Sequence, residues 1–464
     1  KKKHRRSLNI TLALLCYAFA LGAKEVAILC FPVYYLILSR THDEKLPNES
    51  SAVRSARFNT FGLFATEAAV YFVIRWMILG QISRPAEAAT GMFGIILTAP
   101  SIFLFYVRQI IFPYWVGINY GLRPVEQADV SNFLVPLVIS VISVACLWQL
   151  ACRSNIQKLG IALFALPLLP VFNIRAFQPD QIVHDRYLYL SLFGFLMIVF
   201  PYIRELFAKI FPPRSDRIFL AFAVLISIPL AVQTFFYNRV WQDELSLWKH
   251  AITVDALSAS NWSALGSELS ERDQLNEAVT AYNTSLEIRP GARAYIGRAQ
   301  TLIKTGDVDD AITDLQTVIS TDVTSKDVTE IDAYALYQAY EALAVGYQQK
   351  NKLDKAEAAL IEGRNRLAIY RAALTGKLAV ILYQQNRKQD ALKELEAMKG
   401  QARVELLPAS KAVLLRLGML YSEMGRREDA KSYLQEYLRL TVTTWDKETP
   451  EGRKQAVEIL RQFK

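Results

Sequence analysis

The sequence predicts an all-α protein in which a polytopic transmembrane helical bundle is followed by a solenoid of helical repeats. Residues 1 to about 240 consist mostly of apolar runs, several of them long enough to cross a bilayer. The remainder is polar, rich in alanine and composed of good helix formers. In that second half, small residues recur in pairs at a fixed offset, which is typical of a repeat protein.

Composition excludes several classes of protein. Of 464 residues, 52% are hydrophobic and 21% charged, which is unlike a disordered or fibrous chain. The net charge of +9 arises mainly in the first half, where Lys and Arg cluster between apolar runs as in cytoplasmic loops, so no nucleic-acid partner is expected. The cysteines show no CxxC spacing, and neither a metal site nor a disulfide framework is predicted. They are Cys16, Cys30, Cys146 and Cys152.

Eight apolar runs account for the first half. Several have about 20 residues, enough to cross about 30 Å of hydrocarbon. The first two are short, and Lys24-Glu25 lies between them, which predicts a hairpin of two short helices. The runs are 8–22, 25–38, 60–80, 93–112, 131–151, 158–174, 187–206 and 217–237.

Basic residues in the connections predict the orientation of this domain. They gather at 1–6, 39–58, 152–158 and 204–217, and cytoplasmic loops carry such an excess. All four connections lie in the cytoplasm only if one run does not cross. We expect 93–112 to be re-entrant, because it contains Arg108 and is followed by Pro113. This predicts a transmembrane domain over 1–240, with about seven crossings and one re-entrant segment.

The second half begins with a recognisable repeat. Residues 258–290 contain Trp262, the pair Leu265-Gly266, then Ala278, Tyr282 and Pro290. This is the tetratricopeptide repeat (TPR) pattern, in which small residues allow two helices to cross closely, aromatic residues fill gaps and Pro ends the second helix.

The same pattern recurs along the rest of the chain. Five alanines, 33 to 45 residues apart, each follow a small residue by twelve positions. We predict a linker helix at 241–257, about five TPRs at 258–445 and a capping helix at 446–464. Arrays of this kind bind peptides or proteins in a concave groove. The small-residue pairs are Gly266/Ala278, Ala299/Ala311, Ala344/Ala356, Ala379/Ala391 and Gly418/Ala430.

The order of four motifs resembles a known family. An apolar run is broken by Lys24-Glu25, an aromatic stretch spans 112–120, an Asp-Arg-Tyr-Leu-Tyr-Leu motif spans 185–190, and 241–248 leads into the repeats. This order, over roughly residues 8–290, resembles the transmembrane and tetratricopeptide-repeat proteins. The eukaryotic members of that family are lumenal protein O-mannosyltransferases with a GT-C fold.

The resemblance implies a lipid-phosphate sugar donor and transfer of the sugar to Ser or Thr of a protein, outside the cytoplasm. Such chemistry needs a carboxylate to accept the hydroxyl proton and cations to hold the departing phosphate. In this family, the acidic residue usually follows the first membrane helix. The resemblance therefore implies that the chain corresponds to the C-terminal portion of the family, without the N-terminal helices and the catalytic loop. The chain is then a fragment, or the missing part lies elsewhere, or the protein has kept the scaffold without the activity.

The resemblance also implies candidate site residues. Arg186, Lys24 and Arg108 are candidates to contact the lipid phosphate. Asp185 and Glu25 are candidates to orient these cations, and His184 is a candidate for proton transfer, which makes these three the catalytic candidates. The alternatives are ion pairs that order the bundle and an interfacial belt that includes Tyr187 and Tyr189.

Two functions are consistent with these patterns. The first is a glycosyltransferase that uses a lipid-phosphate-linked sugar and whose array presents acceptor proteins. The second is a non-catalytic membrane scaffold whose array binds a partner protein in a larger assembly. A transporter is less favoured, because no inverted repeat is visible. Both functions predict contact with membrane lipids and with a protein, no metal, and a bacterial inner membrane with a periplasmic array.

Overall fold

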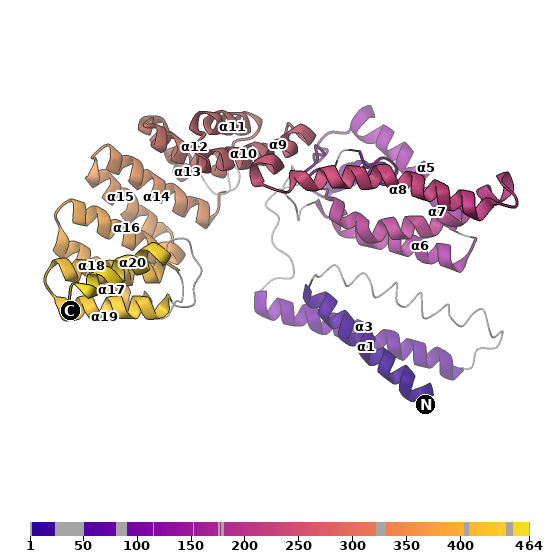
Figure 1. Cartoon of the computed structure of the whole chain (residues 1–464), viewed down its shortest axis with the longest axis horizontal. Helices are drawn as coiled ribbons and strands as arrows, with labels where there is room; N and C mark the ends of the chain where they lie inside the picture. Colours follow the sequence, from indigo (N-terminus) through magenta and orange to yellow (C-terminus); the bar gives the residue numbers. More distant parts are fainter. Residues whose placement is uncertain are drawn as a thin grey trace. The chain divides into compact units, whose positions relative to one another are not determined.

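The computed structural model describes residues 2–23, 51–79, 91–114, 116–151, 153–174, 177, 181–321, 331–402, 408–441 and 449–463. Every regular element in these ranges is helical, which confirms the predicted all-α class. The chain divides into two compact units, 1–258 and 259–464 (Figure 1). The first contains the apolar helices and the second contains the repeats.

The described part of the first unit contains long apolar helices and a few short 3₁₀ and π segments. Five of its described segments are long and apolar enough to cross a membrane: Phe61–Ile78, Met92–Ile111, Val130–Ala151, Asp185–Ile210 and Ser215–Val240. The main helices are α1 (Lys2–Ala23), α3 (Ser51–Leu79), α4 (Met92–Ile111), α5 (Val135–Ala151), α6 (Asn155–Ala165), α7 (Leu188–Ile210), α8 (Ser215–Val240) and α9 (Glu244–Val254).

Two of the predicted runs take a more specific form in the structure. The run 158–174 is divided, because α6 ends at Ala165 and a 3₁₀ segment, η3 (Leu166–Phe172), follows it. Pro167 and Pro170 lack the N–H groups that a continuing α-helix needs. The run 93–112 is a single helix, α4. A helix of this length can either cross a membrane or enter and leave on one side, and its re-entrant path therefore stays a prediction. The run 25–38 lies outside the described residues.

Helices α6 and α7 approach each other closely through two glycines. A Cβ atom on Gly194 would lie 2.4 Å from the backbone nitrogen of Phe164, and one on Gly160 would lie 2.8 Å from the carbonyl oxygen of Gly194. Any larger side chain at either position would separate the two helices. Small residues serve this purpose in membrane proteins, where close packing stabilises helix pairs.

The described residues of the second unit form five helix pairs and a final helix. In each pair, the predicted alanine of the second helix is 0% exposed and the predicted small residue of the first helix is buried. The pairs are α10 (Ala259–Glu271) with α11 (Leu275–Ile288), α12 (Ala292–Thr305) with α13 (Val308–Ser320), α14 (Ala333–Gln349) with α15 (Leu353–Arg366), α16 (Arg371–Gln384) with α17 (Lys388–Ala402), and α18 (Pro408–Glu423) with α19 (Arg427–Leu440), and α20 (Thr449–Arg461) follows.

Each turn between paired helices contains a residue in the left-handed conformation. Glycine and asparagine supply four of them, because these residues tolerate positive φ better than others do. The fifth is an aspartate. The residues and their φ angles are Asp273 at 58°, Gly306 at 99°, Asn351 at 55°, Asn386 at 64° and Gly425 at 75°.

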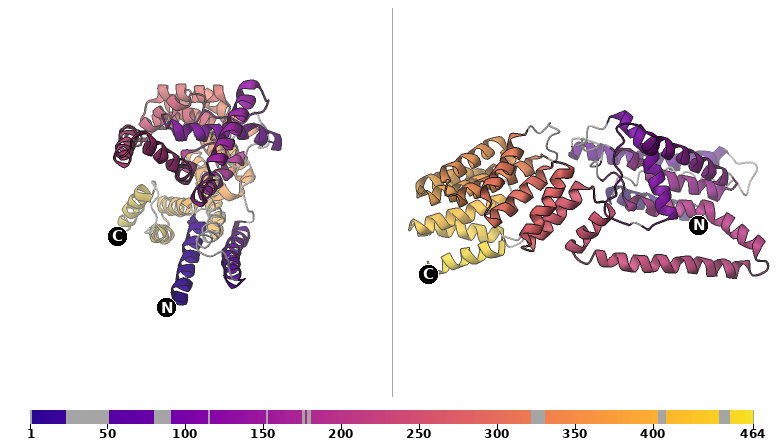
Figure 2. Two further views of the ribbon diagram at one scale, coloured as in Figure 1. Left: turned by 90° about the vertical axis from the view of Figure 1, so that its right-hand side faces the viewer. Right: turned by 90° about the horizontal axis from the view of Figure 1, so that it is seen from above.

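The pairs stack one after another in chain order (Figure 2). First helices of neighbouring pairs also pack against each other, from α10 to α12 and onward to α18. In the described part of the array, successive second helices do not pack to the same extent. The first helices therefore form the inner, concave side of a curved array, which is the side that solenoid proteins use for binding.

We predict that Ala311→Leu destabilises the array by about 1–3 kcal/mol, because Ala311 is fully buried between helices and the larger side chain overpacks that site. The control is Thr313→Leu, an exposed position on the same helix, α13. The measurement is urea denaturation of the whole chain in detergent, and proteolysis within the repeats monitors the unfolding. Equal midpoints for the two variants would contradict close packing at Ala311.

Candidate functional site

A cavity of about 560 Å³ lies in the first unit, where the second half of α4, residues 120–122 of the loop that follows it and the end of α9 meet. Its polar lining comes from Ser101, Arg108, Gln109, Tyr120 and Thr253. The remaining lining is largely apolar, so the cavity could hold a ligand with both a charged group and a hydrocarbon part. These other residues are Leu104, Phe105, Gly121, Leu122 and Val254.

The carboxylate of Asp185 is tied to two residues of this lining. Tyr120 donates a short hydrogen bond to Asp185 Oδ2, and Gln109 Nε2 donates to Oδ1 at 3.3 Å. Asp185 begins the 3₁₀ turn η5 (Asp185–Tyr187), which leads directly into α7.

Tyr120 is buried and held from several sides. Its hydroxyl accepts a hydrogen bond from the backbone N–H of Gly117 at 3.0 Å, and its ring packs edge-on against Phe105, with centroids 4.8 Å apart. Burial, together with the negative charge of Asp185, raises the pKa of Tyr120 above its usual value. The phenol therefore stays protonated and remains a donor to Asp185.

The residue before Asp185 is fixed through its backbone. The Tyr106 hydroxyl, which is fully buried, donates to the carbonyl oxygen of His184 and accepts from its N–H, both at 3.1 Å. The His184 ring lies near the rings of Phe177 and Tyr187, at centroid distances of 5.9 and 6.4 Å. These contacts set the path of the chain into Asp185.

The loop that carries Tyr120 is bound to α9 at two points. Arg123 Nη2 lies 2.7 Å from Oδ2 of Asp255, whose side chain is 3% exposed, and Arg123 Nη1 donates to the Tyr120 carbonyl at 3.1 Å. His250 Nε2 lies 2.8 Å from the carbonyl oxygen of Val116. The end of α9 therefore positions both the loop and one wall of the cavity.

A third contact comes from α8. The side chain of Gln233 donates to the carbonyl of Tyr114 at 3.1 Å and also to that of Pro113. Both carbonyls follow the end of α4, where the helix no longer supplies partners for them. Gln233 therefore fixes the first residues of the same loop.

The structure brings two of the predicted site residues to one place. Arg108 lines the cavity, and its neighbour Gln109 donates to Asp185. Arg186 is exposed, and its guanidinium lies over the ring of Tyr187, 5.4 Å from the centroid, so the described partners of Asp185 are Tyr120 and Gln109 rather than Arg186. Lys24 and Glu25 lie outside the described residues.

Sequence patterns missed four residues of this site. Gln109 interrupts an apolar run and Tyr120 ends an aromatic stretch, so both carried a weak signal. Arg123 and Asp255 are 132 positions apart, and no pattern in the sequence predicts that they form an ion pair. In the ranges that the structure describes, no group of three or more His, Cys, Asp or Glu could hold a metal ion.

Comparison with known proteins confirms the repeats. Two tetratricopeptide repeat models match residues 263–320 and 412–441. A solved TPR protein from Parabacteroides merdae is 14% identical, with a TM-score of 0.35, covering 59% of this chain and 93% of that one. TPR-like repeats of a putative kinesin light chain from Podosopora anserina are 16% identical, with a TM-score of 0.33, covering 39% and 93%.

Curated relatives confirm the resemblance to the transmembrane and TPR family. Protein O-mannosyl-transferase TMTC2 of Mus musculus is 30% identical over 142 residues, covering 30% of this chain and 16% of the relative. TMTC3 of Homo sapiens is 24% identical over 214 residues, covering 41% and 23%. TMTC4 of Mus musculus is 23% identical over 237 residues, covering 45% and 30%. The chain thus matches less than a third of the length of these relatives.

We predict that Tyr120→Phe destabilises the first unit by about 1–3 kcal/mol, because Asp185 loses a donor in a partly desolvated site. Tyr114→Phe serves as the control, since Tyr114 belongs to the same loop and is 73% exposed. Denaturation of the whole chain in detergent, monitored by tryptophan fluorescence, measures the difference in stability between the two variants. If the two variants unfold alike, the hydrogen bond to Asp185 does not stabilise the loop.

Proposed function

We propose that the chain is part of a polytopic glycosyltransferase that transfers a sugar from a lipid-phosphate donor to Ser or Thr of a protein on the extracytoplasmic side. One observation carries the proposal. In a chain similar to protein O-mannosyl-transferases, Arg108 lines a part-apolar cavity next to the Asp185–Tyr120–Gln109 cluster. The chain matches only part of those relatives, and we therefore propose the sugar transfer as the activity of the whole protein.

The cavity supplies what a lipid phosphate requires. The guanidinium of Arg108 provides a positive charge that can pair with a phosphate. Leu104, Phe105 and Leu122 offer apolar surface to the hydrocarbon chain. Binding of this kind stabilises the charge that develops on the phosphate as the sugar leaves.

We propose that the other candidate residues contact the phosphate, assist proton transfer or position other side chains. Arg186 and Lys24 are further contacts for the phosphate, with Glu25 orienting Lys24. His184 assists proton transfer to or from the acceptor hydroxyl. Asp185 is a positioning residue, because its two donors, Tyr120 and Gln109, both line the cavity.

The array and the membrane location complete the proposal. The concave side of the array presents acceptor proteins, as TPR arrays typically bind proteins. The four basic connections support an odd number of crossings, which brings the array to the periplasmic side of a bacterial inner membrane.

A second candidate function is a non-catalytic scaffold whose array holds a partner protein. It is favoured by the contacts of Asp185, whose carboxylate already accepts two hydrogen bonds from Tyr120 and Gln109 and so has a structural role in the described residues. A stoichiometric partner that copurifies with the native protein, without any sugar turnover, would favour this scaffold.

We predict that Arg108→Ala lowers sugar transfer by roughly tenfold to a hundredfold in the full-length protein, since a charge-assisted contact to the phosphate contributes about 1.5–3 kcal/mol. Arg186→Ala is expected to act in the same direction. Arg214→Ala, in the connection between α7 and α8, is the control. Turnover of a lipid-linked sugar is measured in vesicles, and unchanged rates in the first two variants would remove the phosphate assignment.

We predict that a cysteine placed in the array is labelled from outside the intact cell. In a chain whose four natural cysteines are replaced by alanine, Thr313→Cys should react with a membrane-impermeant maleimide. Arg214→Cys, between α7 and α8, should react only after the membrane is permeabilised. The reverse pattern would place the array in the cytoplasm and would show that the number of crossings is even.

A further inference from the structure

Two connections of the first unit meet at the end of α7. Arg153 follows α5, and its Nη1 lies 3.9 Å from Oε2 of Glu205 on α7. The same guanidinium lies 5.0 Å from the centroid of the Tyr202 ring. The Tyr202 hydroxyl donates a hydrogen bond to the carbonyl oxygen of Leu150 at 2.5 Å. These contacts place the end of α5 beside the last turns of α7.

The first turns of α6 and α8 adjoin α7 as well. Arg204 Nη2 of α7 lies 3.4 Å from Oδ1 of Asp216, which belongs to the first turn of α8. At the start of α6, the side chain of Gln157 donates to the carbonyl oxygen of Ile198 at 3.2 Å. Residues of four helices, α5 to α8, therefore border the last three turns of α7.

This end of the unit carries an excess of positive charge. The two connections and the helix turns next to them contain six basic residues and two acidic residues, Glu205 and Asp216. All six basic side chains are exposed. The six basic residues, called the basic patch below, are Arg153, Lys158, Arg204, Lys209, Arg214 and Arg217.

The acidic residues beside the basic patch already have cationic partners. Glu205 pairs with Arg153 and with Lys209, whose Nζ lies 2.8 Å from its Oε1, and Asp216 pairs with Arg204. Half of the basic patch is left without an ion-pair partner among the residues that the structure describes. These three residues are Lys158, Arg214 and Arg217.

Exposed apolar side chains border the basic patch. Leu206 and Ile210 of α7 are 53% and 56% exposed, and Leu220 of α8 is also exposed. Helices α7 and α8 belong to segments that are long and apolar enough to cross a membrane, so the basic patch lies where these helices leave the hydrocarbon. A soluble anion would compensate only the charge. A lipid with an anionic headgroup also covers the apolar side chains with its acyl chains.

We propose that the basic patch binds the headgroup of an anionic phospholipid, whose acyl chains lie against the exposed apolar side chains of α7 and α8. Guanidinium groups such as those of Arg214 and Arg217 carry paired N–H donors that fit phosphate oxygens. The inference does not depend on sugar transfer or on the role of the array. It adds selectivity for lipid charge to the general lipid contact of a membrane domain.

The test measures lipid binding to the whole chain in a neutral detergent by native mass spectrometry. The probes are phosphatidylglycerol and phosphatidylcholine with the same acyl chains. We expect the anionic lipid to bind at least tenfold more tightly, because the zwitterionic headgroup brings a positive charge to the basic patch. Inorganic phosphate is not expected to displace the lipid, since it lacks acyl chains. Equal affinities for the two lipids, or displacement by phosphate, would overturn the proposal.

Two double variants locate the binding. Lys158→Gln/Arg217→Gln removes two positive charges but no ion pair of the described residues, and it is expected to raise the Kd of phosphatidylglycerol at least fivefold. Arg239→Gln/Lys249→Gln removes the same charge from exposed positions in the last turn of α8 and on α9, and it should leave Kd unchanged. Equal weakening by both would show attraction to net charge alone and would overturn the assignment.

A third variant changes the affinity in the opposite direction. Asp216→Asn removes a negative charge from the edge of the basic patch and is expected to lower the Kd of phosphatidylglycerol about twofold or more. A misfolded protein could not bind more tightly. Equal Kd values for the natural chain, Asp216→Asn and Lys158→Gln/Arg217→Gln would overturn the proposal.

The outcome is separable from the proposed enzyme activity. Asp185 precedes α7, whereas the basic patch lies at its other end, and the 23 residues of this helix extend over about 35 Å. Arg108→Ala is therefore expected to reduce sugar transfer and leave the Kd of phosphatidylglycerol unchanged. Weakening of this lipid by Arg108→Ala, but not by Lys158→Gln/Arg217→Gln, would assign it to the cavity and overturn the proposal.

Discussion

The hydrogen bonds to Asp185 are the interaction on which the first unit's site depends. A carboxylate that is partly removed from water requires donors, and here Tyr120 and Gln109 provide them. Tyr120 can do so only while its loop stays in place. That loop is fixed in turn by Arg123 and Asp255 at the end of α9. A series of polar contacts therefore extends from Asp185 at the start of α7, through Tyr120 in the cavity wall, to Asp255 just before the repeats.

The two units satisfy opposite packing requirements. In the first, α8 has no buried residue, and its apolar side chains face outward, as expected of a helix whose solvent is lipid. In the second, apolar side chains form a continuous core between helix pairs, and the surface is polar and carries ion pairs such as Arg426–Asp429. Helices in both units thus have the same secondary structure, but the position of their apolar residues determines whether the exposed surface suits lipid or water.

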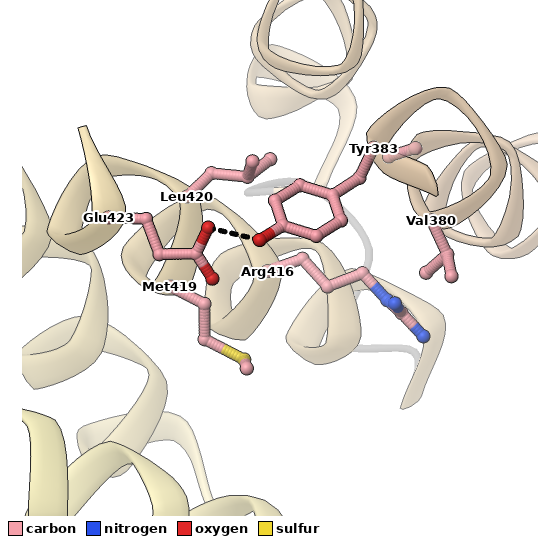
Figure 3. A pocket seen from close by; sticks show the side chains of 7 residues that line it. Val380, Tyr383, Arg416, Met419, Leu420 and Glu423 are labelled. Carbon is pink, nitrogen blue, oxygen red and sulfur yellow. Dashed lines mark hydrogen bonds between the residues drawn. The ribbon is translucent and has the colours of Figure 1, made fainter. Parts of the chain in front are cut away.

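The two candidate sites also differ in how they are built. The cavity in the first unit is formed by a loop and by residues far apart in the chain, so many contacts must hold together for it to exist. A pocket of about 200 Å³ on the array is formed by two equivalent helices of neighbouring repeats, α16 and α18 (Figure 3). Repetition supplies its backbone frame, and a hydrogen bond from Tyr383 of α16 to Glu423 of α18 joins the two helices along one wall.

The sequence by itself determined the all-helical class, the apolar half and the repeats. Apolar runs and the twelve-residue offset between Gly266 and Ala278 are local patterns, and helix geometry converts such patterns directly into buried faces. It also indicated Asp185 and Arg108, because charged residues beside apolar runs stand out. Only the tertiary structure decided that Tyr120 and Gln109 are the partners of Asp185, and that Arg123 meets Asp255 across 132 positions. Such pairings follow from how helices and loops pack in three dimensions, and no periodicity along the chain encodes them.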